Sequence, residues 1–431
     1  MAVMSLHRKL FFLLLVFLPT QLGYHTWPFW TYVLGRRIDY LSPTLYFTDV
    51  IVGVLLVIWC TQSIWKSYKK NDSNLYGKIL SNIIYNKRLF FVIPIVILVF
   101  VNIHFAINPY IALYGWVKII EYVFLILYIF RQHVSVSQAL LPLSVGVLYS
   151  SMIGIAQYGL QHSLGGIFWF LGERTFYIDT PGIARISVCQ LFGSSCLLKL
   201  RAYSTFSHPN VFGGYLAVII PLLVHHWNQD HKRMYRLSAG IGSVALMLTF
   251  SRSSWVIAMF GIFGIWIWKR MSSVTTFGLI VACVVMLVGG FIYAPVQEES
   301  VVVRQQLNVA ALEIWKHSPY FGVGVGNFLV ALPSSLVSKQ VYFLQPVHNI
   351  YLLILAEIGL VGVGICLGVL LWLFDMVRLS KNSVHPLVFS IGSLMLLGLV
   401  DHYLLTLQQG QLLLVLISAL FLSETSVHPK G

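Results

Sequence analysis

Long apolar runs separated by short polar stretches make up most of the chain. Twelve apolar segments can be distinguished, near residues 8–22, 46–65, 89–106, 109–130, 138–160, 209–227, 237–251, 253–268, 274–294, 350–374, 386–405 and 411–423. Most of them approach the roughly 20 residues that an α-helix needs to cross a bilayer. Because a helix satisfies its own backbone hydrogen bonds inside lipid, the pattern predicts an all-α polytopic membrane protein with about twelve transmembrane helices.

The composition agrees with this pattern and excludes a soluble fold. The 431 residues are 58% hydrophobic and 10% charged, with a mean hydropathy of +0.81. Soluble domains are nearer 45–50% apolar and about 25% charged. Since the sequence shows no low-complexity tract and no convincing internal repeat, we expect a single integral membrane domain over residues 1–431.

The basic residues predict how the helices are oriented. With the N-terminus inside, 17 Lys and Arg residues fall on the inner side, 10 on the outer side and one, Lys118, within a span. This bias favours both chain ends inside, and it explains the net charge of +14 without a nucleic-acid partner. Most of the outer basic residues lie in two long extracytoplasmic loops, 161–208 and 295–348, which length and charge mark as functional.

Two further features bear on processing and redox state. The N-terminal segment resembles a signal peptide but lacks a small-residue cleavage site, so we expect a retained first helix. Cys189 and Cys196 share one loop and could form a disulfide on an oxidising side, or could remain two small thiols.

The stretch "LKLRAYSTFSHPNVFGGYL", residues 198–216, is a first candidate site. Arg201 stands at the outer end of the loop, and His208 and Asn210 offer hydrogen bonds. Pro209 suits the first turn of a helix, and the two glycines that follow permit close helix packing. An ordinary capped helix start with an interfacial arginine explains the same residues.

Two more arginines lie on the predicted outer side. Arg252 separates two apolar runs with almost no loop, where a charge is costly unless it faces water, an anion or the membrane interface. Arg304 stands at the head of a predicted amphipathic helix whose apolar residues recur at helical spacing. The "GVGVG" stretch at 322–326 lacks the context of a nucleotide-binding loop, and instead lets backbone pass close to membrane helices or to a ligand.

A His-Asn pair precedes the long apolar segment near residue 350. His348 and Asn349 fall at a helix N-terminus, where unpaired N–H groups and the helix dipole favour an anion. A neutral imidazole in this field can accept a proton, although a capping or interfacial histidine is the plainer interpretation. Glu357 lies about 12 Å further along the helix axis and must be protonated or paired inside the bundle, so we expect a structural role.

These stretches together resemble one known family. "TFSHPN", "FSRSSW", "WKHSPYFGVGVGNF" and the outer His-Asn pair occur in the order found in the O-antigen ligase and polymerase superfamily. The ligase pattern H-[NSQ]-x9-G-x-x-[GTY] is matched at every position by His348, Asn349, Gly359 and Gly362. The resemblance covers roughly residues 198–364, whereas the N-terminal half agrees only in hydropathy and loop placement.

The resemblance implies a fold and a reaction. The fold would be GT-C-like, with a long, partly helical extracytoplasmic loop over the site. The protein would lie in the bacterial cytoplasmic membrane, with its active site on the outer, periplasmic face. It would move a glycan from undecaprenyl diphosphate to a hydroxyl of a glycan, lipid A core or protein acceptor, with inversion and without a metal or cofactor.

The resemblance also implies roles for individual residues. His348 resembles the general base, and Arg201 resembles an arginine that holds the donor diphosphate. Arg304 looks like a second phosphate-binding arginine, with Arg252 a further candidate, while His208, Asn210 and Asn349 complete the expected substrate-binding set. The chemistry agrees, because arginines can neutralise a diphosphate leaving group where carboxylate ligands for a metal are dispersed.

Two alternatives to a ligase remain open. A polysaccharide polymerase of the same superfamily would carry the same motifs. A transporter of lipid-linked sugars would suit the intramembrane Lys118, Arg252 and Glu357, although no repeated halves of the kind common in transporters are visible.

Overall fold

The structure is a computed structural model, and it describes residues 4–69, 89–189, 196–268, 299–335, 344–379 and 386–427. This part of the chain is mostly helical, and its strands form three two-stranded antiparallel ladders. The predicted apolar segment 274–294 lies outside the described residues. Each of the other predicted apolar segments overlaps a described helix, and 386–405 overlaps two.

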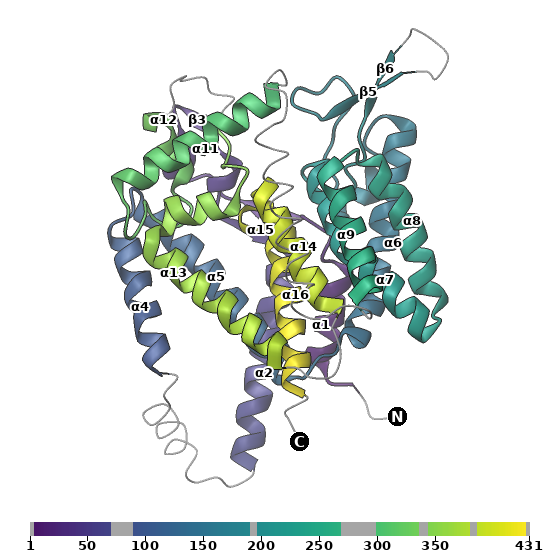
Figure 1. Ribbon diagram of the computed structural model, residues 1–431, viewed down its shortest axis with the longest axis horizontal. Helices are drawn as coiled ribbons and strands as arrows, with labels where there is room; N and C mark the ends of the chain where they lie inside the picture. The colour runs from purple at the N-terminus through teal and green to yellow at the C-terminus, as the bar shows by residue number, and fades with distance from the viewer. Residues whose placement is uncertain are drawn as a thin grey trace.

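The described helices run in chain order from α1 to α16 (Figure 1). Their bounds are α1 (Leu6–Val16), α2 (Phe47–Lys69), α4 (Leu89–His104), α5 (Pro109–Arg131), α6 (Val136–Leu160), α7 (Pro209–Asp230), α8 (Arg233–Leu248), α9 (Arg252–Trp268), α11 (Glu299–His317), α12 (Phe328–Ser335), α13 (Ile350–Leu379), α14 (Pro386–Val400), α15 (Tyr403–Thr406) and α16 (Gln408–Val427).

Five of the described helices are long and apolar enough to cross a membrane, namely those over 47–65, 109–131, 136–160, 209–230 and 350–372. Three shorter apolar helices cover 93–104, 252–267 and 386–400. These helices are those of an all-α membrane protein. The arrangement of twelve spans remains a prediction.

Local sequence explains where several helices begin. α5 starts at Pro109, and the preceding Asn108 side chain accepts the N–H groups of Tyr110 and Ile111. α7 starts at Pro209, whose missing N–H costs nothing in a first turn, and the His208 side chain caps it by accepting the N–H of Asn210. The predicted helix start at 209 is therefore confirmed.

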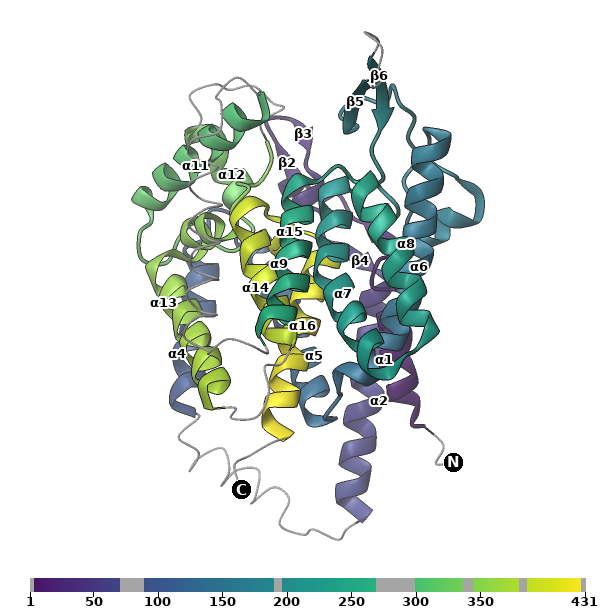
Figure 2. The ribbon, with the colours of Figure 1, turned by 45° about the vertical axis from the view of Figure 1, so that its right-hand side comes forward.

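The short elements connect the helices at one end of the bundle. β1 (Gly23–His25) pairs with β4 (Thr44–Tyr46), and β2 (Tyr32–Val33) pairs with β3 (Arg36–Arg37). The 3₁₀ helices η1, η2 and η3 cover Phe29–Thr31, Asp39–Leu41 and Gly166–Leu171. β5 (Arg185–Cys189) and β6 (Cys196–Leu200) form a hairpin that projects beyond the helices in Figure 2.

The hairpin bears on the cysteine prediction. Cys196 is disulfide-bonded. The strand register pairs Cys189 with Cys196. Among the described residues, Cys60 and Cys366 are free.

The helices form two groups with α14, α15 and α16 between them (Figure 1). On one side, α6, α7, α8 and α9 pack together, and α14 contacts both α7 and α9. On the other side, α11 and α12 pack on α13, and α4 packs on α5. The larger hydrophobic core joins the first group to α1, α2, α5 and α16, and a smaller core lies between α11, α12 and α13.

A buried ion pair joins two of the candidate spans. The Lys118 ammonium of α5 lies 2.6 Å from Asp49 of α2 and 2.9 Å from Glu121 of its own helix. Gln408, the first residue of α16, also donates to Asp49. Lys118 is thus neutralised inside the bundle, as a charge at this depth requires.

The backbone of α13 bends where the "GVGVG" stretch crosses it. Gly359 has φ 68°, and a Cβ there would stand 2.4 Å from the carbonyl carbon of Tyr320. Gly322 has φ 67°, and a Cβ there would stand 2.3 Å from the carbonyl carbon of Glu357. The glycines therefore permit contact between two backbones, which was one of the two interpretations of this stretch.

Hydrogen bonds from outside α13 satisfy the backbone carbonyls beside its bend. The N–H groups of Val323 and Gly324 donate to the carbonyls of Ala356 and Glu357, each at 3.0 Å. Asn102 of α4 donates to the carbonyls of Phe321 and Glu357. These contacts satisfy groups that a helix break inside a membrane would leave unpaired.

Glu357 has the structural role that its position predicted. Its carboxylate accepts the N–H of Phe328 at the first turn of α12, at 3.3 Å. The side chain thereby joins the bend in α13 to the helix that follows the glycine stretch.

The predicted segment 386–405 is not a single helix, and the prediction is wrong in this respect. α14 ends at Val400, Asp401 and His402 interrupt it, and α15 then forms one short turn. A Cβ at Gly214 of α7 would lie 1.7 Å from the hydroxyl of Tyr403, so only glycine lets the α15 turn pack this closely. The break places the Asp401 and His402 side chains inside the bundle, where α14 ends.

Replacing Gly359 by alanine should destabilise the fold. The positive φ and the contact with Tyr320 both disfavour a Cβ, at a combined cost of about 2–4 kcal/mol. Gly364→Ala is the matched control, because a Cβ at Gly364 meets nothing within 4 Å on the same helix. The thermal midpoint in detergent should fall for Gly359→Ala alone, and equal midpoints for both variants would contradict this account of the bend.

Candidate functional site

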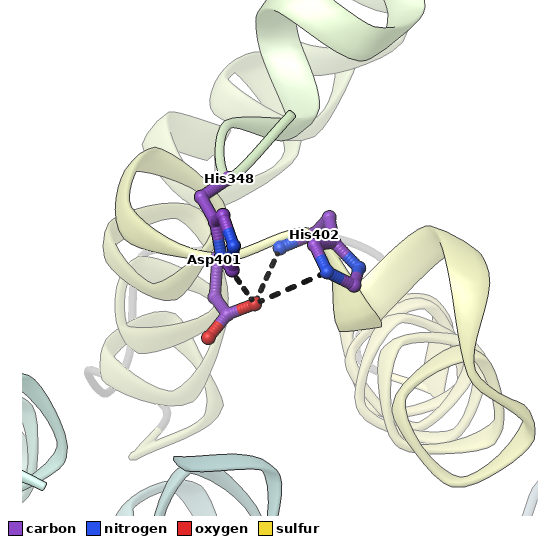
Figure 3. Close-up of side chains that lie close together, drawn as sticks. All are labelled: His348, Asp401 and His402. Atoms are coloured by element: carbon purple, nitrogen blue, oxygen red, sulfur yellow. Dashed lines mark hydrogen bonds and ion pairs between the residues drawn. The ribbon is translucent and has the colours of Figure 1, made fainter. Parts of the chain in front are cut away.

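Three polar side chains converge where α13 begins and α14 ends (Figure 3). Nδ1 of His348 lies 3.4 Å from Oδ1 of Asp401. The same oxygen accepts the backbone N–H of His402 at 2.8 Å, and Nε2 of His402 lies 3.9 Å from it. The His348 and His402 rings are 4.9 Å apart. One carboxylate therefore organises two imidazoles from separate elements.

The His348–Asp401 contact is close without being an aligned hydrogen bond. The distance is that of an ion pair, yet Nδ1 of His348 is buried and makes no hydrogen bond of good geometry. The two side chains are therefore in close contact without a hydrogen bond between them.

The surroundings set the charges of the cluster. Burial alone would raise the pKa of the Asp401 carboxyl, but His348, His402 and Arg304 together hold this pKa well below its usual value. Burial lowers the pKa of His402 to about 3 and the pKa of His208 to about 4. At neutral pH, Asp401 is a carboxylate, and His402 and His208 are neutral.

Asn349 positions His348 through backbone contacts. Its Oδ1 accepts the N–H groups of Tyr351 and Leu352 at 2.9 and 3.1 Å, which caps α13. Its Nδ2 donates to the carbonyl of Leu399 at 3.4 Å, next to the end of α14. Asn349 thus links the two helix ends that carry His348 and Asp401, and its side chain is occupied by the protein itself.

A cavity of about 970 Å³ opens beside the cluster. His348, Asp401 and His402 line it, together with His208 at the start of α7 and Arg174 from the loop after η3. Between α5 and α16 the lining becomes apolar, with Val123, Ile126, Leu414 and Val415. One space therefore joins a polar region to an apolar region among candidate membrane spans.

Arg201 and Asn210 form a unit beside this cavity. Nη2 of Arg201 donates to Oδ1 of Asn210 at 2.7 Å, and Nε donates to the carbonyl of Thr249 at 2.6 Å. Burial lowers the pKa of the Arg201 guanidinium to about 10, so the group stays charged at neutral pH. Its charge also helps to lower the pKa of His208, which places Arg201 close to the cavity wall.

The other two predicted arginines differ from each other. α11 begins at Glu299, so Arg304 lies inside the helix and not at its head. Nη1 of Arg304 donates to the carbonyl of Val400 at 2.9 Å, directly before Asp401. Arg252 begins α9 as predicted from its place between two apolar runs, and its side chain is exposed.

The structure separates the predicted site residues into two sets. His348 and His208 line the cavity, whereas the lining does not include Arg201, Arg252, Arg304, Asn210 and Asn349. Sequence patterns did not identify Asp401, His402 and Arg174, which also line it. An Asp-His pair inside an apolar run was a usable signal for two of these residues.

The cluster also offers the donor atoms that a metal ion would use. His348, Asp401 and His402 each place one ligand atom within 4.8 Å of the others, and of the described residues only these three do so. Two imidazoles and a carboxylate suit a transition metal. Metal independence is therefore an expectation that an experiment has to test.

The two depressed histidine pKa values predict how stability depends on pH. An unfolded histidine binds a proton near pH 6.5, whereas His402 and His208 stay neutral in the fold down to about pH 3 and 4. As the pH falls from 6.5 toward 4, the unfolded state gains protons that the fold excludes, and stability is lost. The thermal midpoint in detergent should decrease across this window, and less steeply in His402→Gln. Identical slopes for the two proteins would count against a buried neutral His402.

The comparisons with known proteins agree with the motif evidence. A family model described as O-antigen ligase matches residues 237–367, which include Arg252, Arg304, His348 and Asn349. No curated protein sequence matches the chain significantly. The family is one of membrane glycosyltransferases of the ligase or polymerase type that use lipid-linked glycans. Residues 237–367 of this apolar, helical chain thus match the O-antigen ligase domain, which supports membership of that superfamily.

Proposed function

We propose that this protein is an inverting glycosyltransferase that moves a glycan from an undecaprenyl-diphosphate carrier to an acceptor hydroxyl. The observation that carries the proposal is the His348–Asp401 pair on the wall of a cavity that Arg174 also lines. In the predicted orientation, this cavity opens on the periplasmic face of the cytoplasmic membrane. The acceptor is a glycan, a lipid A core or a protein side chain.

His348 is the proposed general base. Because Nδ1 faces the ionised Asp401, the neutral ring carries its proton on Nδ1 and leaves Nε2 free to accept another. As the acceptor oxygen attacks the anomeric carbon, its proton passes to Nε2. The bond between that carbon and the diphosphate oxygen breaks, and the lipid diphosphate leaves with the bonding electrons. Asp401 orients the ring and stabilises the imidazolium.

Arginine charge is the proposed means of stabilising the leaving diphosphate. Arg201 directly follows β6 and Arg304 lies in α11, and the charges of both act on His208. Each donates to a backbone carbonyl in this arrangement, so binding a diphosphate would exchange a neutral acceptor for a charged one. Arg174 already lines the cavity and is a further candidate.

The apolar part of the cavity suits the lipid carrier. Its lining between α5 and α16 lies among helices of membrane-spanning length and composition. A donor could keep its isoprenoid chain against these helices while its diphosphate reaches the polar region. This placement would let the reaction proceed without extracting the lipid from the membrane.

Two other functions are weighed against this one. A polymerase would use the same base and arginines, and differs only in transferring to another lipid-linked glycan. A transporter drew support from intramembrane charges, but Lys118 is paired with Asp49 and Glu121, and Glu357 caps α12. These contacts explain both charges structurally and favour the enzyme.

Removing the proposed base should abolish most of the activity. His348→Ala should lower kcat/KM by about 10²–10⁴, the usual contribution of general base catalysis. Transfer from a purified lipid-linked donor to acceptor is measured with the full chain in detergent, with EDTA present throughout. His317→Ala is the control, because His317 is exposed at the end of α11. Full activity in His348→Ala would refute the base, and loss of wild-type activity in EDTA would refute metal independence.

Removing an arginine that is proposed to bind the diphosphate should mainly change the kinetic constants for the donor. Arg201→Ala should lower kcat/KM for the donor by about 10²–10³, because a charge that stabilises the leaving group is lost. Arg185→Ala, which removes an exposed arginine of β5, is the matched control and should retain wild-type kinetics. Equal kinetics in the two variants would remove Arg201 from the mechanism.

A further inference from the structure

We infer that the first extramembrane loop, residues 23–46, forms a sugar-binding subsite, with Asp39 and Tyr40 as the residues that contact the sugar ring. This inference rests on the proposed function and specifies which part of the substrate the cavity holds next to the cluster. The family match begins at residue 237 and does not include this loop.

The loop forms one wall of the cavity. His25, Asp39, Tyr40, Ser42 and Tyr46 all line the space that His348, Asp401 and His402 also line. The Tyr40 and His402 rings meet edge to face, with centroids 5.5 Å apart. A ligand that touches Tyr40 would therefore lie beside the proposed catalytic pair.

Buried and exposed side chains alternate in this part of the loop. Ile38 and Leu41 are buried in the smaller hydrophobic core, at 8% and 4% exposure. Asp39 and Tyr40 lie between them in η2, and Tyr40 is 40% exposed. Because Ile38 and Leu41 anchor both ends of this turn, Asp39 and Tyr40 are held at the cavity wall.

Hydrogen bonds hold the loop in this shape. β1 pairs with β4, and Nδ1 of His25 lies 2.9 Å from the hydroxyl of Thr44. The Tyr114 hydroxyl of α5 accepts the N–H of Thr44 and donates to its carbonyl, both at 3.1 Å. The subsite is therefore largely formed before any ligand binds, which reduces the entropy lost on binding.

Asp39 and Tyr40 leave their polar groups available. Among the described residues, the Asp39 carboxylate and the Tyr40 hydroxyl have no hydrogen-bond or ion-pair partner. The charged groups that act on the Tyr40 hydroxyl are Asp401, Asp39 and Arg174. A carboxylate can accept two hydroxyl hydrogen bonds, and an aromatic ring can cover an apolar face.

A pyranose ring has the chemistry that this pair requires. Its rim carries adjacent hydroxyls that donate to a carboxylate, and one face presents C–H groups to an aromatic ring. A lipid tail would leave the Asp39 carboxylate without a partner, and a diphosphate would be repelled by it. The ring could belong to the acceptor or to the first sugar of the donor, since both meet at His348.

Steady-state kinetics of the full chain in detergent separate these two sources. The probes are purified lipid-linked donor and the acceptor oligosaccharide released by mild acid from the source cells. Tyr40→Ala and Asp39→Asn should each raise the KM for either donor or acceptor by about tenfold, because the variant loses a stacked ring or a charge-assisted hydrogen bond. The value of kcat should stay nearly unchanged. A rise in acceptor KM assigns the acceptor sugar, and a rise in donor KM assigns the donor sugar.

Matched controls and a binding readout make the test decisive. Tyr177→Ala and Asp179→Asn replace exposed residues of the same types outside this loop and outside the cavity lining, and should keep both KM values. Saturation-transfer NMR tests oligosaccharide binding without requiring turnover. Signal lost in the Tyr40 and Asp39 variants and kept in the controls supports the subsite even if wild-type transfer fails. Unchanged KM values, or equal NMR signals in all proteins, would overturn it while leaving the proposed function in place.

Discussion

The backbone crossing between Gly322 and Gly359 is the contact on which the rest of the site depends. Two segments of the backbone approach so closely that a Cβ at either glycine would overlap the other segment. The crossing bends α13, joins it to α11 and α12 through the glycine stretch, and fixes where its first turns point. His348 stands at the start of this helix, so its position follows from the crossing.

Interrupted helices supply the rest of the chemistry. α14 stops at Val400 and leaves Asp401 and His402 at the bundle end, where continuous helix would have placed apolar residues. Arg304 donates to the carbonyl of Val400, and Asn349 donates to the neighbouring carbonyl of Leu399. Polar side chains thus satisfy backbone groups that the break exposes, and one of them, Arg304, also brings a positive charge to the Asp401 carboxylate.

Sequence patterns predicted the helices well because length and hydropathy are local properties. They also led to the proposals for His348 and Arg201, because a His-Asn helix start and an arginine beside a Pro-capped helix are short motifs. They did not identify Asp401, because its role depends on contact with a residue 53 positions earlier in the chain. Tyr40 and Arg174 were missed for the same reason, since the cavity joins loops that no local pattern relates.

The structure also assigns to the fold several residues that sequence alone left ambiguous. Glu357 caps α12, Asn349 caps α13 and Lys118 is paired with two carboxylates. Lys118 and Glu357 also line the cavity, where these contacts hold their side chains. From the sequence, the glycines could be explained by close approach either to a ligand or to a helix. The backbone that they contact lies far away in the sequence, so no local pattern could decide between the two.

The anomeric configuration of the product tests the central claim most directly. One base and a diphosphate leaving group on the opposite side of the sugar require a single displacement. The product of wild-type transfer, analysed by NMR against the purified lipid-linked donor, should carry the inverted configuration at the transferred anomeric carbon. A product with retained configuration would require a covalent glycosyl intermediate and would contradict the role given to His348.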